Sequence, residues 1–198
     1  MPNYLECISI QKEEEPVLLR LAQGADLGRI MEILADGREA LAALDIDQWQ
    51  NGYPYQETIA RDVELRESYV VEDNDGRLHA TAMIGFKEEN DYLLIEEGEW
   101  LTDSVPGKPA YAVVHRVAVA RESRGRGLAA FVLREAEKLA LSAGCQSVRI
   151  DTHPGNTPML GLLKKQGYTR CGIIYISHAG ESTPERIAYE KLLASSAR

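Results

Sequence analysis

The chain has 198 residues, of which 44% are hydrophobic and 27% charged, and its formal net charge is −9. These proportions are typical of a globular protein, and the acidic balance argues against nucleic-acid and membrane-surface partners, which both require a basic face. The chain shows no signal peptide, no membrane-length apolar run, and no paired or metal-binding pattern among its three cysteines. A cytoplasmic protein without a metal is therefore expected.

Residues 1–16 are polar and are expected to precede a single domain over residues 17–198. Apolar side chains that alternate indicate strands, and apolar side chains three or four positions apart indicate helices. The elements predicted in the first half are a strand at 17–21, a helix from Leu27, a second helix at 40–49 after Gly37, a loop at 50–55, a helix at 56–67, a hairpin at 68–86 and a short strand at 92–96.

The second half of the chain alternates strands with helices. The predicted elements are a strand at 110–120, a loop at 122–127, a helix from Leu128 to Gly144, a strand at 147–151, a helix from Asn156 to Gly167, and strands at 168–176 and 186–192. Together with the first half, this order predicts an α/β (or α+β) fold in which one sheet has helices on both sides.

A glycine- and arginine-rich loop, residues 124–129, joins a predicted strand to a predicted helix. Its glycines let backbone N–H groups approach a ligand, and the start of the helix adds a partial positive charge. Residues 116–149 carry a net charge of +4, whereas the rest of the chain carries −13. The pattern favours a phosphate or pyrophosphate site, although a tight turn with solvated arginines would contain the same residues.

A dinucleotide-binding loop is one alternative, because Gly125, Gly127 and Ala130 fit its glycine pattern and Asp151 ends the next predicted strand. However, fewer than fifty residues follow Asp151, too few for the remaining strand–helix units of that fold. A P-loop is excluded because no Gly-Lys-Ser/Thr follows the glycines.

Three motifs, in the correct order and spacing, resemble the GNAT family of N-acetyltransferases. The matching positions are 116–119 in the strand, Arg124, Gly127 and Ala129 in the loop, and Asn156 with 165–168 at the two ends of the later helix. The resemblance covers about residues 17–193 and is specific over 111–176. It implies a mixed, mostly antiparallel sheet with helices on both sides and splayed central strands.

The resemblance also implies an enzyme that uses acetyl-CoA. The loop would bind the pyrophosphate, the preceding strand would pair with the pantetheine arm, and a backbone N–H near Val117 would polarise the thioester carbonyl. Asn156 would contact the arm, although it is equally well placed to cap its helix. The implied cofactor-binding residues are Val117, Ala118, Val119, Arg124, Gly125, Arg126, Gly127, Leu128, Ala129 and Asn156.

His115 is the candidate general base that would remove a proton from the attacking amine. By the two-residue period of a strand it would share one face with Val113, Val117 and Val119. A histidine nine residues before the loop arginine is the base in arylalkylamine N-acetyltransferases, which this strand resembles locally. A hydrogen-bonded structural histidine is the alternative.

Other candidates for proton transfer are weaker. His153 follows a strand near the expected cleft, whereas His79 and His178 are interpreted as structural or surface residues. The family often has a tyrosine that protonates the thiolate, but Leu163 stands at that position. Tyr175 could replace it, or the thiolate could leave unassisted, since a thiol pKa near about 8.5 requires little protonation.

The candidate acceptor contacts are Trp49 and Tyr53 in a loop, Glu97 in an acidic stretch, and His153. A small core and a solvated face are the alternatives for the aromatic and acidic residues. We expect acetyl transfer to a primary amine, either small or on a peptide, by direct attack in a ternary complex. A non-catalytic CoA-binding regulatory module is the alternative function. The resemblance also favours a homodimer.

Overall fold

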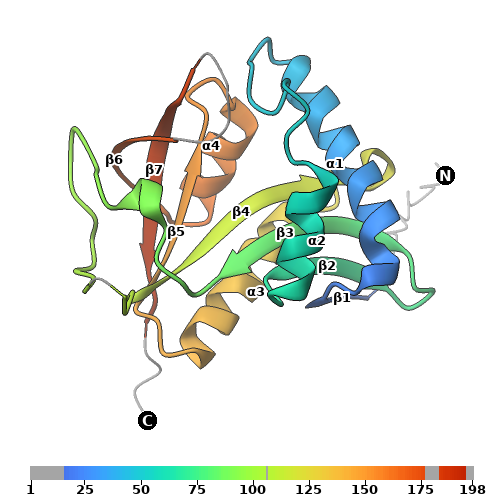
Figure 1. Cartoon of the computed structure of the whole chain (residues 1–198), viewed down its shortest axis with the longest axis horizontal. Coiled ribbons are helices and arrows are strands. Elements are labelled where there is room, and N and C mark those ends of the chain that lie inside the picture. The colour runs from blue at the N-terminus through green and yellow to red at the C-terminus, as the bar shows by residue number, and fades with distance from the viewer. Residues whose placement is uncertain (1–15, 106, 177–182, 195–198) are drawn as a thin grey trace, which may run out of the picture.

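The structure is a computed structural model that describes residues 16–105, 107–176 and 183–194, which form a seven-stranded sheet (Figure 1). The strands are β1 (Val17–Leu21), β2 (Ser68–Asp73), β3 (Leu78–Gly85), β4 (Tyr111–Val119), β5 (Ser147–Thr152), β6 (Thr169–Tyr175) and β7 (Glu185–Leu192). They lie in the order β1-β2-β3-β4-β5-β7-β6, and only β4 and β5 are parallel neighbours within the described sheet. The predicted mixed, mostly antiparallel sheet is thus confirmed. The predicted leader lies outside the described residues, except for Pro16.

Helices cover both faces of the sheet, as predicted (Figure 1). They are α1 (Leu27–Ala42), α2 (Gln56–Glu64), α3 (Leu128–Ser142) and α4 (Thr157–Lys165). Ile33 of α1 and Ile59 of α2 pack with Ala118 on one face of β4. Leu133 of α3 packs with Val114 on the other face. Because β4 is buried on both sides, its sequence is a nearly continuous apolar run.

The central strands β4 and β5 are splayed, as the resemblance implied. They pair only from Tyr111 opposite Ser147 to Val113 opposite Arg149, although β4 continues to Val119. Each strand stays paired on its other side, β4 with β3 and β5 with β7. The sheet therefore consists of two half-sheets that separate beyond Val113.

A β-bulge at Arg116 changes the predicted side-chain pattern of β4. β4 has one more residue than β3 between two consecutive paired positions, and Arg116 adopts a left-handed φ of 53°. Val117 and Val119 consequently pack toward α3, on the face opposite Val113 and His115. The prediction that these four residues share one face is wrong, because strict alternation requires an unbulged strand.

Two predicted elements differ in the structure. Helix α1 runs through Gly37 without a break. The glycine is explained by packing, since it leaves room for the ring of Trp49: a Cβ at Gly37 would lie 3.1 Å from Trp49 Cζ3. The second helix predicted at 40–49 is therefore only the end of α1 and the turns that follow it. The strand predicted at 92–96 is reduced to a single bridge between Glu96 and Ile173.

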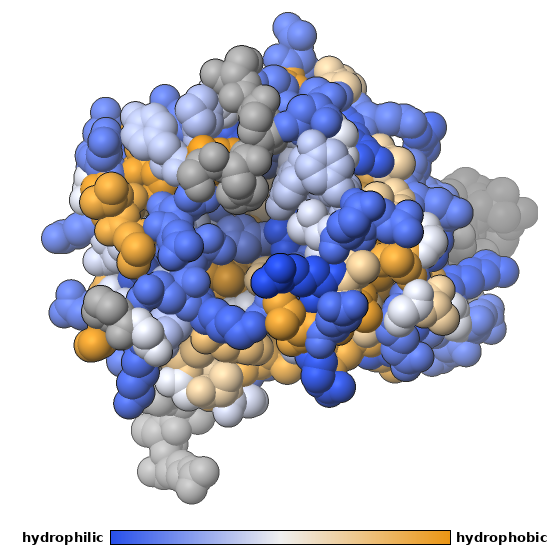
Figure 2. Space-filling view, in the orientation of Figure 1, coloured by the Kyte–Doolittle hydropathy of each residue, from blue (hydrophilic) through white to orange (hydrophobic). Residues whose placement is uncertain are grey.

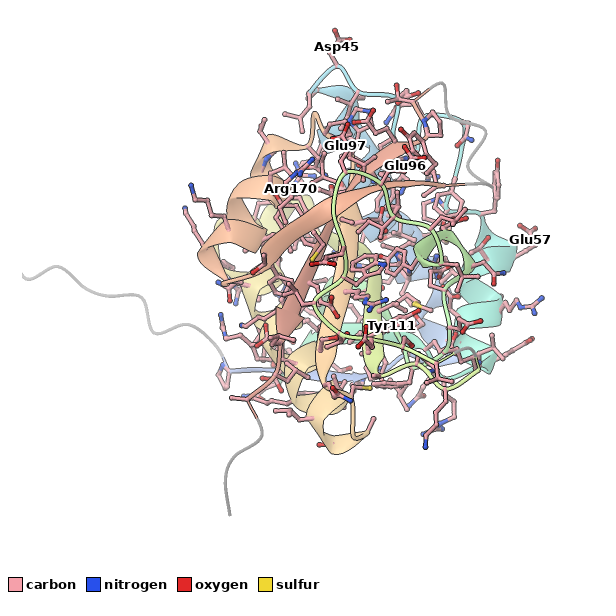
Figure 3. The ribbon with its side chains drawn as sticks, turned by 90° about the vertical axis from the view of Figure 1, so that its left-hand side faces the viewer. Asp45, Glu57, Glu96, Glu97, Tyr111 and Arg170 are labelled. Atoms are coloured by element: carbon pink, nitrogen blue, oxygen red, sulfur yellow. The ribbon has the colours of Figure 1, made fainter. Side chains whose placement is uncertain are left out.

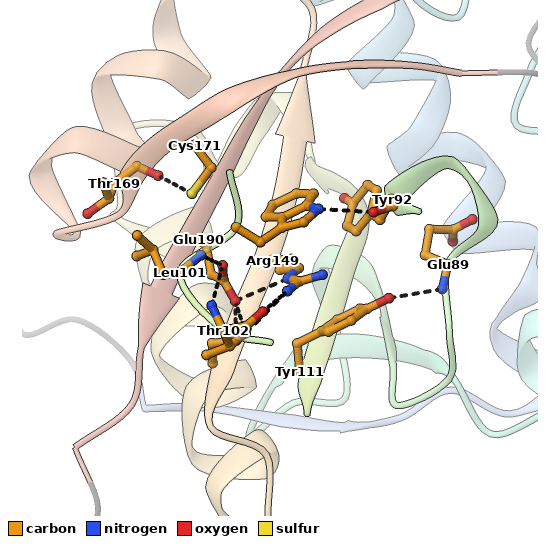
Figure 4. Close-up of polar contacts among 11 residues, drawn as sticks. Glu89, Tyr92, Leu101, Thr102, Tyr111, Arg149, Thr169, Cys171 and Glu190 are labelled. Atoms are coloured by element: carbon orange, nitrogen blue, oxygen red, sulfur yellow. Dashed lines mark hydrogen bonds and ion pairs between the residues drawn. The ribbon is translucent and has the colours of Figure 1, made fainter. Parts of the chain in front are cut away.

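The described residues between β3 and β4, 86–105 and 107–110, lie over the face of the sheet that carries His115 and are fixed there by a buried cation (Figure 4). The guanidinium carbon of Arg149 is 4.2 Å from the ring centre of Trp100 and 3.9 Å from that of Tyr111. Its Nε is 3.1 Å from Oε1 of Glu190, and its NH2 group donates a hydrogen bond of 2.6 Å to the carbonyl of Thr102. Both charged residues are almost fully buried.

Hydrophilic residues cover most of the face seen in Figure 2, and hydrophobic patches interrupt them. Leu93 and Leu94, on the segment over the sheet, are 57% and 82% exposed. Across the part of the chain that the structure describes, no helix is long and apolar enough to cross a membrane.

The Arg149–Glu190 pair should be required for stability. We expect Arg149→Met to lower the free energy of unfolding by about 3–5 kcal/mol, because it leaves the Glu190 carboxylate buried without a cation. Urea denaturation would measure this loss. Lys138→Met is the control, since Lys138 pairs with Glu135 at the surface, and such a pair contributes less than about 1 kcal/mol. Equal losses in the two variants would contradict the prediction.

Candidate active site

A cavity of about 410 Å³ opens where β4 and β5 diverge, and it contains most of the predicted site. Its walls come from the ends of these two strands, from α1 and the loop after it, and from the start of α4. The predicted residues that line it are Trp49, Tyr53, His115, Val117, Ala118, Val119, Arg124, Ala129 and Asn156. One cavity thus connects the candidate base, the candidate cofactor strand and the glycine-rich loop.

His115 lies in this cavity between two carboxylates. Its Nε2 is 3.2 Å from Oε2 of Glu89, and its Nδ1 is 3.6 Å from Oδ1 of Asp151. Tyr92 donates a hydrogen bond of 2.8 Å to the same oxygen of Asp151. Burial, followed by the charge of Asp151, raises the pKa of Tyr92 well above its ordinary value, so this hydroxyl keeps its proton.

Each ring nitrogen of His115 faces one carboxylate oxygen. A neutral imidazole has a single N–H donor and can satisfy only one of the two carboxylates. The imidazolium form has two N–H donors, one for each of these carboxylates.

The glycine-rich loop has the backbone geometry of an anion site. Gly125 and Gly127 have φ values of 81° and 72°, a left-handed conformation that glycine adopts without strain. Gly127 is the N-cap residue of α3, and no side chain caps the helix. The first N–H groups of α3 are therefore available to a ligand, and the helix adds a partial positive charge.

The predicted loop residues divide between two surfaces. Arg124 and Ala129 line the main cavity, whereas Gly125, Arg126, Gly127 and Leu128 line a separate shallow hollow. Arg134 of α3 also lines this hollow. A long, bent ligand with a phosphate group could therefore occupy both surfaces across the start of α3.

The residues around α4 have clear structural roles. The side chain of Asn156 accepts a hydrogen bond of 3.2 Å from the N–H of Met159, so it caps α4 and also lines the cavity. Leu163 is buried in the core between α3 and α4. Tyr175 is 47% exposed and does not line the cavity.

Tyr53 is held by an ion pair that we did not identify from the sequence. Arg116 donates one hydrogen bond of 2.8 Å to the hydroxyl of Tyr53 and another of 2.7 Å to Asp62 of α2. Burial raises the pKa of Tyr53, and the neighbouring guanidinium opposes this increase. The bulge directs Arg116 toward α2, so the strand that carries His115 also fixes the loop that carries Tyr53.

Two predicted acceptor contacts lie elsewhere. Glu97 pairs with Arg170 at 3.8 Å, outside the cavity, and the two residues lie side by side in Figure 3. The acidic stretch around Glu97 therefore has a neighbouring cation from β6, which its local sequence does not reveal. His153 is buried, accepts a hydrogen bond from the N–H of Gly155, and lies 3.4 Å from Asp47 without lining the cavity. His178 lies outside the described residues.

Glu89, Tyr92 and Asp62 were not identified from the sequence, and Asp151 was considered only as part of a dinucleotide motif. These residues belong to segments far from His115 and Arg116 in the chain. The periodicity of a single sequence does not show which distant segments lie together in the fold. The period-two alternation of β5 was the one available signal, since it places Asp151 on the same face as the buried Arg149.

The Arg116–Asp62 pair should stabilise the wall of the cavity. We expect Asp62→Ala to lower the free energy of unfolding by about 3 kcal/mol, because the buried guanidinium loses its carboxylate. Thermal and urea unfolding would measure the change. Glu64→Ala removes the same charge from an exposed position of the same helix and should cost less than about 1 kcal/mol. If Asp62→Ala were as stable as the control, the Arg116–Asp62 pair would not stabilise this wall.

Comparisons with known proteins identify the family. The family model described as "Acetyltransferase (GNAT) family" matches residues 34–168. A GNAT-family acetyltransferase structure from Streptococcus agalactiae 2603 is 30% identical, with a TM-score of 0.78, over 90% of this chain and 96% of that one. A GNAT-family structure from Listeria monocytogenes 4b F2365 is 22% identical, with a TM-score of 0.67, over 89% and 95% of the two chains, and shows the shared fold.

A curated relative agrees with these matches. It is a protein of Bacillus subtilis (strain 168), provisionally named phosphinothricin acetyltransferase YwnH, and is 25% identical over 78% of this chain and 85% of its own length. The family match covers the strand, loop and helix that form the cavity described above. The chain therefore belongs to the GNAT family of acetyltransferases.

Proposed function

We propose that the protein transfers the acetyl group of acetyl-CoA to a primary amine, by direct attack of the amine on the thioester within a ternary complex. The observation that carries this proposal is the single cavity that extends from Arg124 and Ala129 to His115. Acetyl-CoA is the donor used in this family, and a donor bound at the loop would extend its thioester toward His115.

The edge of β4 that faces β5 supports a binding site for the pantetheine arm and the thioester. Arg116 and Val117 have no partner in the register between β3 and β4, and β5 has already diverged from this part of β4. An edge without a strand partner can pair with an extended ligand that carries amide groups. The N–H of Val117 would then stabilise the negative charge that develops on the thioester oxygen.

His115 would act as the base. An alkylamine has a pKa near about 10.4, so it arrives mostly as an ammonium ion and must lose a proton to become nucleophilic. His115 would accept this proton, and Glu89 and Asp151 would stabilise the imidazolium. The departing CoA thiolate is a weak base, so the location of Leu163 and Tyr175 outside the cavity does not prevent turnover.

The charges around His115 favour a cationic acceptor. Three acids line this end of the cavity: Glu89, Asp91 and Asp151. Of the neighbouring cations, Arg116 is paired with Asp62, and Arg186 lies 4.0 Å from Asp151 while donating to backbone carbonyls. An amine that arrives as an ammonium ion, on a small molecule or a peptide, is therefore the proposed acceptor.

Release of CoA thiol in the presence of acetyl-CoA and a panel of amines tests this proposal. We expect thiol release that depends on the acceptor, with an N-acetylated product detected by mass spectrometry. Calorimetry with acetyl-CoA alone measures binding separately. Binding without thiol release from any acceptor would instead favour the non-catalytic CoA-binding module.

The role of His115 gives a sharper prediction. We expect His115→Gln to lower kcat/KM by about a hundredfold to ten-thousandfold, the range for loss of a general base. The decline of activity at acidic pH, which protonation of the base produces, should disappear in this variant. His153→Gln serves as the comparison, because His153 does not line the cavity, and it should leave the pH profile unchanged. An unchanged pH profile in His115→Gln would exclude His115 as the base.

A further inference from the structure

We propose that a buried chain of hydrogen bonds, Asp73–His79–Ser123, holds the glycine-rich loop in the conformation that binds the phosphates of coenzyme A. This inference rests on the proposed function, because it assigns the three residues a part in cofactor binding. None of them lines either of the two cavities described above, so they act as positioning residues and not as ligand contacts.

His79 of β3 is bonded through both ring nitrogens. Its Nδ1 is 2.8 Å from the hydroxyl oxygen of Ser123, and its Nε2 is 2.8 Å from Oδ2 of Asp73. His79 is 8% exposed, Ser123 2% and Asp73 5%. Asp73 also accepts the N–H groups of Asp75 and Arg77, which ties it to the turn between β2 and β3. The chain of hydrogen bonds therefore begins at a rigid anchor.

The direction of these hydrogen bonds follows from the charge of Asp73. The bond from His79 is the main cause that lowers the pKa of Asp73, and an ionised carboxylate can only accept hydrogen bonds. Nε2 of His79 therefore carries a hydrogen, and in the neutral ring Nδ1 accepts the hydroxyl hydrogen of Ser123. This fixes the side-chain orientation of Ser123.

Ser123 stands at the entrance of the glycine-rich loop. It ends a short 3₁₀ turn, Arg121–Ser123, and Arg124 follows directly. The carbonyl of His79 also accepts the N–H of Ala120 at 2.8 Å. His79 thus holds the chain just before Gly125, where glycine flexibility would otherwise allow many loop conformations.

The exposed ion pairs of this turn are weaker restraints. Arg29 pairs with Glu122, and Arg121 pairs with Glu39, but the two glutamates are 61% and 67% exposed. Exposed ion pairs contribute little, because water and salt screen them, whereas a satisfied buried network is not exposed to this competition.

Asp36 of α1 is a second anchor of the turn. It accepts the N–H of Arg121 at 2.8 Å, and its carbonyl accepts a hydrogen bond of 2.6 Å from the side chain of Arg124. The buried chain therefore holds the turn from β3, while Asp36 holds it from α1.

The order Asp–His–Ser also occurs in the catalytic triads of hydrolases. Here it has a different use, because Ser123 is buried and does not line either cavity, so no substrate could reach its hydroxyl. The same three side chains connect the β2–β3 turn to the loop and leave the loop backbone free for a ligand.

Substitutions at two positions separate this role from a general effect on stability. Ser123→Ala removes the bond to the loop. An asparagine at position 79 places its amide where Nδ1 lies, so His79→Asn keeps the contact with Ser123, whereas His79→Gln keeps the contact with Asp73 and loses the one with Ser123. Glu122→Gln is the control, because it changes only an exposed contact of the same turn. Calorimetry gives the Kd for coenzyme A, and thermal unfolding without ligand gives the stability of each variant.

We expect Ser123→Ala and His79→Gln to raise the Kd for coenzyme A about fivefold, which corresponds to about 1 kcal/mol for one neutral hydrogen bond. Glu122→Gln should stay within about twofold of the wild type, and His79→Asn should weaken binding less than His79→Gln, because it keeps the bond to Ser123 and loses only the bond to Asp73. Unchanged binding by Ser123→Ala, or equal weakening by the two His79 variants, would overturn the inference. A wild-type chain that binds no coenzyme A would instead refute the proposed function, and the inference with it.

Discussion

Beyond Val113, β4 and β5 no longer share hydrogen bonds, and the active-site cavity depends on this break in the sheet. Both strands remain paired on their other sides, so neither can turn back toward the other without losing an existing ladder. The bulge at Arg116 then leaves Val117 without a partner in the β3 register as well. The edge of β4 that faces β5 therefore has no strand partner beyond Val113, and it is the proposed binding surface for an extended polar ligand.

The segment over the sheet, residues 86–105 and 107–110, connects the separation of β4 and β5 with the surroundings of His115. It carries Glu89 and Tyr92 to His115, and it has little regular structure of its own. The Arg149–Glu190 pair provides the missing rigidity, because it holds Trp100 and Tyr111 against β5 and β7. A buried ion pair of this kind is costly to form, but once formed it admits few alternative positions for the groups around it.

The sequence predicts the strands and most of the helices, because the spacing of apolar residues in a long segment indicates which of its faces is buried. It fails where distant residues decide the outcome. The sequence predicts a second helix after Gly37, whereas in the structure Gly37 lies inside one continuous helix, where it leaves room for the ring of Trp49. Alternation placed His115 and Val117 on one face, and the bulge separated them. The loop motif predicts a cofactor side, which stays a prediction, whereas Glu89 and Asp151 reach His115 only through the fold.

The distribution of charge along the chain also differs from its distribution in the structure. The net charge of +4 over residues 116–149 suggested a basic surface for phosphates. In the structure, Arg116 and Arg149 of this stretch are neutralised by Asp62 and Glu190, so the basic segment is less basic in space than along the chain.

The two ends of the cavity are held by separate groups of residues. On the proposed cofactor side, the turn before the glycine-rich loop is bonded to β3 and α1. On the proposed acceptor side, the segment over the sheet is bonded to β5 and β7. The two half-sheets that carry these groups share only three residue pairs. Changes in the segment over the sheet can therefore alter the contacts around His115 while the loop stays in place. Under the proposed function, the fold could keep one donor and accept different amines.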